Sequence, residues 1–114
     1  LGQSATGVPE LRDHWEVCLY DEGINIWYHF FEDGVQKWCK IAALALPKDR
    51  LFRANEIHDL SVRLVRTRKG NREMTVTCGG YTLTCTDARL PETFYAGIIG
   101  CEGRNWFYDF RVKE

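Results

Sequence analysis

Five side chains between residues 24 and 41 combine flat aromatic surface with hydrogen-bonding groups: Asn25, Trp27, His29, Trp38 and Lys40. Indole faces can stack on the apolar C–H surfaces of sugar rings, while amide, imidazole and ammonium groups can hydrogen-bond to hydroxyls. We therefore expect these five residues to form a glycan-binding platform. The same residues also suit a sheet face that covers a second sheet, in which case His29 is a structural histidine.

The acidic residues do not form the pattern that glycoside hydrolysis needs. A retaining glycosidase uses two carboxylates about 5–5.5 Å apart, which on strands means positions i and i+2 or a cross-strand pair. Glu16 stands alone on its predicted strand, Glu32 and Asp33 fall in a predicted turn, and Asp109 has no partner nearby in the sequence. We therefore assign no catalytic residue and favour a binding domain over an enzyme.

The five cysteines contain no CxxC pair, so we expect no metal site. The three histidines could in principle activate a cysteine, but no local arrangement supports such a pair. No glycine-rich phosphate loop connects a strand to a helix, and no cofactor is expected. Two disulfides and one free thiol would suit a secreted domain, whereas five buried thiols would suit a cytosolic one. The cysteines do not decide between these two compartments, and we weakly favour the extracellular one.

A β-hairpin must position the aromatic and polar side chains. Asp33-Gly34 lies between two aromatic-rich runs, and a two-residue type I′ turn needs positive φ at both central residues. This turn predicts that Glu32 faces Val35 across the hairpin. The cross-strand pairs that follow are His29 with Trp38, Trp27 with Lys40, and Tyr28 with Cys39. The opposite face is expected to be core and carries Ile24, Ile26, Tyr28, Phe30, Cys39 and Ile41.

Alternating apolar and polar residues predict the remaining strands. They are expected at residues 14–20, 41–46 (continuing the hairpin), 58–66, 73–78, 81–86, 94–101 and 106–112. On the first of these, His14, Glu16, Cys18 and Tyr20 share one face. About eight short strands without a helix predict an all-β antiparallel sandwich of jelly-roll type. Residues 1–10 are expected to be a flexible lead-in, and residues 11–114 a single sandwich domain.

A second hairpin is predicted around Gly79-Gly80, which suits a two-residue turn. The alternation places threonines on one face and apolar residues on the other. Cys78 then lies opposite Tyr81, and Cys85 opposite Met74. Both thiols point into the core, and a disulfide between them is disfavoured because they are not cross-strand partners.

The charge balance argues against nucleic acid and anionic membranes as partners. The chain has 15 basic and 16 acidic residues, for a net charge of −1. It has no run of about 20 apolar residues, which a membrane-spanning helix needs. A local basic cluster is nonetheless present, and it consists of Arg63, Arg66, Arg68, Lys69 and Arg72. We interpret it as a solvated turn, with an anion or acidic-sugar contact as the alternative.

The C-terminal half of the chain, from LSVRLVRT through MTVTCGGYTLTCTD to YAGIIGCEGRNWFYDFRV, resembles the closing strands of concanavalin A-like lectin and glucanase domains. The upstream stretch GINIWYHFFEDGVQKW is similar to the aromatic hairpin of carbohydrate-active sandwich domains. The resemblance implies a jelly roll and glycan recognition, and it carries over no catalytic residue.

The sequence thus favours a lectin-like or carbohydrate-binding domain with a glycan as its partner. One alternative is a protein-interaction or self-assembly sandwich, in which the aromatic face meets an adjoining domain or a second copy of the chain. A further alternative is a small carbohydrate-active enzyme or a fragment of one.

Overall fold

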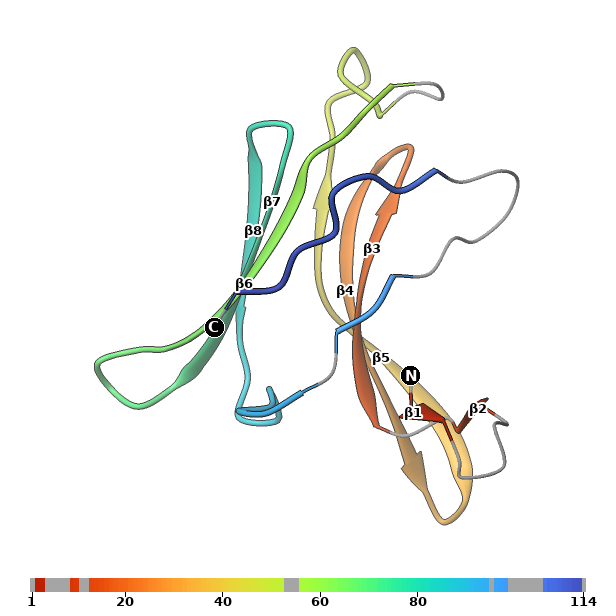
Figure 1. Cartoon of the computed structure of the whole chain (residues 1–114), viewed down its shortest axis with the longest axis vertical. Coiled ribbons are helices and arrows are strands. Elements are labelled where there is room, and N and C mark those ends of the chain that lie inside the picture. The colour runs from red at the N-terminus through yellow and green to blue at the C-terminus, as the bar shows by residue number, and fades with distance from the viewer. Residues whose placement is uncertain are drawn as a thin grey trace.

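The structure of the chain is a computed structural model that describes residues 2–3, 9–10, 13–52, 56–94, 96–98 and 106–113. These residues form strands and loops, with no helix among them. Figure 1 shows a short pair of strands near the N-terminus and two larger groups of strands. The strands are β1 (Gly2–Gln3), β2 (Pro9–Glu10), β3 (His14–Tyr20), β4 (Gly23–Glu32), β5 (Val35–Ala45), β6 (Leu60–Arg66), β7 (Arg72–Cys78) and β8 (Tyr81–Thr86).

All of these strands pair in the antiparallel sense. β1 pairs with β2, and the other six form two three-stranded sheets with the orders β3-β4-β5 and β6-β7-β8. Consecutive strands lie side by side, as short connections between antiparallel strands require. The predicted all-β class and antiparallel pairing are confirmed. β1 and β2 lie within the predicted lead-in, and residues 4–8 between them are outside the described part of the chain.

The hairpin of β4 and β5 has the predicted turn and register. Asp33 has a φ of 52° and Gly34 a φ of 77°, as a type I′ turn requires. The cross-strand pairs predicted from this turn are confirmed: Glu32 with Val35, His29 with Trp38, Tyr28 with Cys39, and Trp27 with Lys40.

A β-bulge then shifts the register towards the other end of the hairpin. Trp27 pairs with Lys40 but Ile26 pairs with Ala42, so Ile41 is an extra residue on β5. Ile41, Ala42 and Leu44 all pack against the core. The bulge therefore brings an additional apolar side chain of β5 to the core side of the sheet.

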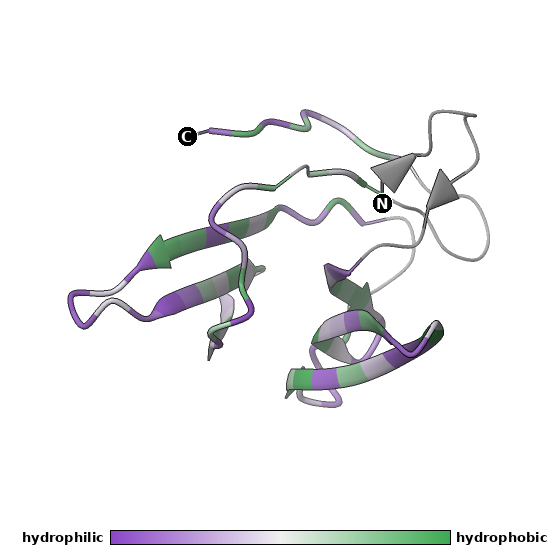
Figure 2. Ribbon diagram, turned by 90° about the horizontal axis from the view of Figure 1, so that it is seen from below, coloured by the Kyte–Doolittle hydropathy of each residue, from purple (hydrophilic) through white to green (hydrophobic). Residues whose placement is uncertain are grey.

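One apolar core is shared by the two larger sheets. Ile24 and Ile26 of β4 belong to the same buried cluster as residues of β7 and β8, and Leu90 from the loop after β8 completes it. Hydrophobic and hydrophilic residues alternate along the strands (Figure 2), so that each sheet offers one apolar face to this cluster. The members from the second sheet are Met74, Val76, Cys78 and Cys85. The inward direction predicted for both cysteines is confirmed.

The predicted core face of the first hairpin is only partly buried. Tyr28, Phe30 and Cys39 are half-buried and are not among the residues that form or pack on the core cluster. Figure 1 shows why, since the tip of the β4–β5 hairpin reaches away from the β6–β8 sheet. The hairpin is longer than the sheet that covers it, so alternation places these side chains on the inner face without burying them.

The strands predicted at residues 94–101 and 106–112 are wrong for the part of them that the structure describes. Residues 94, 96–98 and 106–113 belong to no strand, and Trp106 is 71% exposed. β6 is an edge strand, and its apolar residues Leu60 and Val62 are exposed as well. An alternating sequence forms a strand only where another strand offers free N–H and C=O groups, and that depends on tertiary structure.

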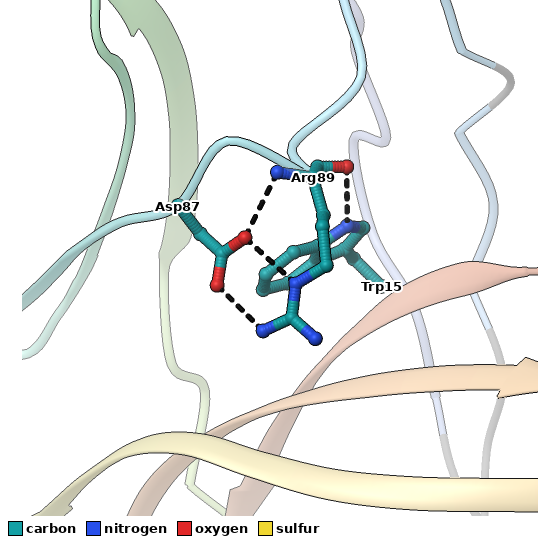
Figure 3. Close-up of polar contacts among 3 residues, drawn as sticks. All are labelled: Trp15, Asp87 and Arg89. Atoms are coloured by element: carbon teal, nitrogen blue, oxygen red, sulfur yellow. Dashed lines mark hydrogen bonds and ion pairs between the residues drawn. The ribbon is translucent and has the colours of Figure 1, made fainter.

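The loop after β8 connects the second sheet to the first through Arg89 (Figure 3). The Asp87 carboxylate accepts hydrogen bonds from the Arg89 backbone N–H at 2.8 Å, from Nε at 2.9 Å and from Nη2 at 2.7 Å. The Arg89 carbonyl oxygen in turn accepts a bond of 3.3 Å from Nε1 of Trp15 on β3. The guanidinium lies 4.7 Å from the ring centre of Tyr28 on β4. These contacts hold the loop that inserts Leu90 into the core.

The core assignment predicts a large cost for truncating Ile26. Because this side chain is fully buried, Ile26→Ala should lower the free energy of unfolding by about 2–5 kcal/mol, as measured by urea denaturation followed by circular dichroism. Val35→Ala is the matched control, because Val35 is 60% exposed at the hairpin turn, and it should change stability by no more than about 0.5 kcal/mol. Equal losses in the two variants would contradict the shared core.

The Asp87–Arg89 contact predicts that the free energy of unfolding depends on pH in the acidic range. Hydrogen bonds from Arg89 hold the pKa of Asp87 below its ordinary value. The stabilisation is therefore present above the unfolded pKa of about 4 and is lost as pH falls through the folded pKa. We expect Asp87→Asn to cost about 1 kcal/mol at pH 7, since Arg89 is half exposed and solvent screens the pair. Unfolding curves from pH 7 to pH 2.5 should show this difference shrinking below about pH 4. A difference that stays constant with pH would contradict the assignment.

Candidate functional site

The five residues predicted to bind a ligand lie on one face of the β3-β4-β5 sheet, opposite the core. β4 alternates, so that Ile24 and Ile26 point to the core while Asn25, Trp27 and His29 point away from it. Pairing with β3 and β5 adds side chains on both sides of these three. We call this surface the outer face and define it by His14, Glu16, Cys18, Asn25, Trp27, His29, Trp38 and Lys40.

These residues are arranged in rows across the sheet. The first row runs from His14 on β3 through His29 on β4 to Trp38 on β5. The next row runs from Glu16 through Trp27 to Lys40, and the third pairs Cys18 with Asn25. Cross-strand partners on one face have Cβ atoms about 4.5–5.5 Å apart, so each row brings its side chains into contact.

His29 is the buried centre of the outer face, with only 2% of its surface exposed. The Trp38 ring lies on one side at a centroid distance of 3.4 Å, and the His14 ring lies on the other at 4.4 Å. Burial lowers the pKa of His29, and proximity to His14 lowers it further, while Glu16 raises it. His29 is therefore a neutral imidazole that supports Trp38, and it has no surface on which a sugar ring could rest.

Trp38 is the more open of the two predicted platform tryptophans, with 57% of its surface exposed. Trp27 is half-buried, and the Lys40 ammonium lies 5.2 Å from the centre of its ring, which is a cation–π distance. The side-chain oxygen of Asn25 is buried and has no hydrogen-bond partner among the described residues. Within the outer face, the accessible aromatic surface is therefore that of Trp38, with Lys40 two residues further along β5.

Two histidines and a carboxylate meet next to this aromatic surface. Oε2 of Glu16 lies 3.3 Å from Nε2 of His29 and 3.7 Å from Nε2 of His14. The other oxygen of Glu16 accepts a hydrogen bond from the Cys18 thiol at 3.5 Å. One potential metal-ligating atom from each of His14, Glu16 and His29 lies within 4.8 Å of the others.

This cluster was not predicted from the sequence. His14 and Glu16 were expected on one face of a strand, but the cross-strand pairs predicted for the hairpin were not extended to that strand. Tyr20 pairs with Gly23, so only Asp21 and Glu22 stand between the paired residues of β3 and β4. Counting back from a two-residue turn at Asp21-Glu22 would have placed His14 opposite His29.

Among the described cysteines, Cys39, Cys78 and Cys85 are free thiols. Cys78 pairs with Tyr81 and Cys85 pairs with Met74, as predicted. Burial raises the pKa of both thiols, with Asp59 contributing for Cys78 and Asp87 for Cys85. Since the thiolate is the reactive form, neither residue is suited to act as a nucleophile.

The basic cluster at the turn between β6 and β7 is partly neutralised. Glu92 forms ion pairs with Arg66 and with Arg72, the latter at 3.1 Å. Arg72 also donates to the carbonyl oxygen of Leu90 at 2.7 Å. These two arginines hold the loop after β8 in place, and Glu92 offsets part of their positive charge.

Comparison of the chain with protein-family models, with curated proteins and with solved structures finds no match. Among the described residues, none forms a helix long and apolar enough to cross a membrane. The functional interpretation therefore depends on the geometry of the outer face.

Proposed function

We propose that the chain is a non-catalytic glycan-binding domain whose ligand rests on the outer face over Trp38. The observation that carries this proposal is the exposure of the Trp38 indole, 57% of whose surface is accessible, on a paired strand of the sheet. Soluble proteins bury most large aromatic side chains, so a rigidly held and exposed indole is typical of a binding surface. Sugar rings present flat C–H surfaces that complement such an indole.

The neighbouring residues supply orientation and polar contacts for a ring on Trp38. The His29 ring, which is buried between Trp38 and His14, packs against the indole from the neighbouring strand. The Lys40 ammonium, exposed on the same face of β5, can donate to hydroxyls or to the carboxylate of an acidic sugar. Trp27 and Asn25 extend the surface towards β3.

Hydrolysis is not proposed. Glu16 is the one carboxylate among the eight outer-face residues, and a glycosidase of the usual kind needs two. The outer face thus lacks the second carboxylate that a glycosidase would need there.

We also propose that the two larger sheets are the layers of a jelly-roll sandwich of the concanavalin A-like kind. Support comes from the apolar core that the sheets share and from the sequence resemblance of β6, β7 and β8, whereas the strands that the resemblance implies after residue 93 are absent from the described residues. Within such a fold the outer face of the β3-β4-β5 sheet would be one of the two broad surfaces of the domain.

A second candidate function is self-assembly, which is favoured by the apolar surface near the C-terminus. Trp106, Tyr108 and Phe110 are exposed, and Leu60 and Val62 on the edge strand β6 are exposed as well. Packing of residues 106–112 of one copy on β6 of another would remove both apolar surfaces from water, and an open edge strand invites such an association.

Glycan binding predicts that Trp38→Ala removes recognition while the fold persists. A glycan-array screen of the purified chain would identify a ligand, and titration calorimetry would then compare variants. Loss of the stacked indole should weaken binding about tenfold or more, which corresponds to about 1.4 kcal/mol. Trp106→Ala is the matched control, because it removes an exposed indole that lies outside the outer face.

The glycan proposal would be refuted if no glycan bound the wild-type chain, or if both tryptophan variants bound it equally well. Circular dichroism of Trp38→Ala should match that of the wild type, because more than half of the indole is already in solvent. A variant that unfolds would mean that Trp38 is part of the core.

Self-assembly predicts that the oligomeric state depends on Trp106 and Phe110 and not on Trp38. Size-exclusion chromatography with light scattering should show a dimer or larger oligomer for the wild type and for Trp38→Ala. The double substitution Trp106→Ala and Phe110→Ala should give a monomer, since it removes two of the exposed rings. A monomeric wild-type chain at 100 μM (roughly the upper range for a specific assembly,) would exclude this second candidate.

A further inference from the structure

We propose that His14, Glu16 and His29 form a binding site for a divalent transition metal ion, with Zn²⁺ as the ion that the ligands fit best. The inference goes beyond glycan binding and does not depend on it. Three side chains from two neighbouring strands bring one ligating atom each to within 4.8 Å of one another. Two imidazoles and one carboxylate are a ligand set that proteins use for zinc.

The interatomic distances are close to those of a metal site. Zn²⁺ binds imidazole nitrogen at about 2.0–2.1 Å and carboxylate oxygen at about 2.0–2.2 Å, so tetrahedral ligands lie about 3.3 Å apart. Oε2 of Glu16 is 3.3 Å from Nε2 of His29 and 3.7 Å from Nε2 of His14. The two imidazole nitrogens lie within 4.8 Å of each other, so they would have to approach by up to about 1.5 Å to close the site around an ion.

The backbone keeps these three side chains together. His14 and Glu16 are two residues apart on β3 and so point to the same side of the sheet. His29 is the cross-strand partner of His14 on β4. Because strand register determines both relationships, the three ligands converge without any contribution from a loop.

His29 is the buried ligand of the proposed site. The residue is 2% exposed, and its Nδ1 has no hydrogen-bond partner among the described residues. A buried polar group without a partner is unfavourable, and buried imidazoles are normally hydrogen-bonded. The nitrogen that faces Glu16 is Nε2, so an ion would bind Nε2, and Nδ1 would remain without a partner among the described residues.

Cys18 supports the carboxylate from behind. Its thiol donates to Oε1 of Glu16 at 3.5 Å, which leaves Oε2 directed at the two histidines. Residues that orient a metal ligand through its other atom are a regular part of metal sites. The Cys18 thiol thus positions Glu16 rather than binding the ion itself.

The site would be open on one side. Trp38 covers His29 from β5, while the side chains of Glu16 and His14 are 36% and 18% exposed on β3. Three protein ligands leave one tetrahedral position for water or for a ligand atom. Mg²⁺ and Ca²⁺ prefer sites made entirely of oxygen, so the two imidazoles select against them.

Titration calorimetry of the metal-stripped full chain with zinc sulfate tests the site. We expect saturable binding of one Zn²⁺ per chain and no binding of Mg²⁺ at the same concentration. Glu16→Gln and His14→Ala should each weaken Zn²⁺ binding by about 100-fold or more, since even residues behind a ligand contribute 10–100-fold. His58→Ala is the matched control, because His58 also lies near a carboxylate, at 3.9 Å from Glu56, but is outside the outer face.

A second readout locates the ion. Co²⁺ bound at this site would quench the fluorescence of Trp38, whose ring is 3.4 Å from that of His29. The quenched component should be lost in Trp38→Phe, while the Co²⁺ stoichiometry should remain one per chain.

The metal site would be excluded if the wild-type chain bound no Zn²⁺ below 1 mM (roughly the weakest affinity of a specific site,). It would also be excluded if Glu16→Gln and His14→Ala bound as the wild type does, or if His58→Ala lost binding. Circular dichroism confirms that each variant is folded, and Glu16→Gln preserves the shape of the side chain if an alanine variant is unstable. Retained glycan binding in Glu16→Gln would separate failure of the metal site from failure of the glycan proposal.

Discussion

The packing of Ile24 and Ile26 into the apolar cluster formed with β7 and β8 is the contact on which the rest of the structure depends. Side chains alternate along a strand, so burying these two isoleucines directs Asn25, Trp27 and His29 to the opposite face. A shift of one residue would exchange the two sets. The same apolar contact that gives the chain a core therefore also creates the outer face, and the bulge at Ile41 increases the apolar surface that β5 contributes to it.

The outer face has a buried part and an open part, and they suggest different ligands. His29 lies between His14 and Trp38, where a sugar ring cannot reach but where two imidazoles and the Glu16 carboxylate could surround a small cation. Trp38 lies above and is open to solvent. A site that holds both would place the free coordination position of a metal near a stacked ligand, because both arise from the same row of cross-strand neighbours.

The second sheet contributes mainly support. Its loop after β8 carries Leu90 into the core, and Asp87, Arg72 and Glu92 hold that loop by ion pairs and hydrogen bonds. Its edge strand β6 and the exposed rings of residues 106–112 leave apolar surface in water. This surface shares no residue with the outer face, so association of copies and binding of a ligand would not compete for the same residues.

The sequence by itself determined the local features of the fold. The Asp33-Gly34 turn, its register, the inward direction of Cys78 and Cys85, and the division of β4 into two faces follow from turn chemistry and alternation between near neighbours. Only the tertiary structure decided how deeply each side chain is buried. Tyr28 was expected in the core but is half-buried, whereas His29 was expected on an open ligand-binding face but is 2% exposed. The tertiary structure alone brought His14 and Glu16 to His29, and it alone left residues 106–112 unpaired. Burial and pairing are sums over contacts distant in sequence, and a local pattern does not contain them.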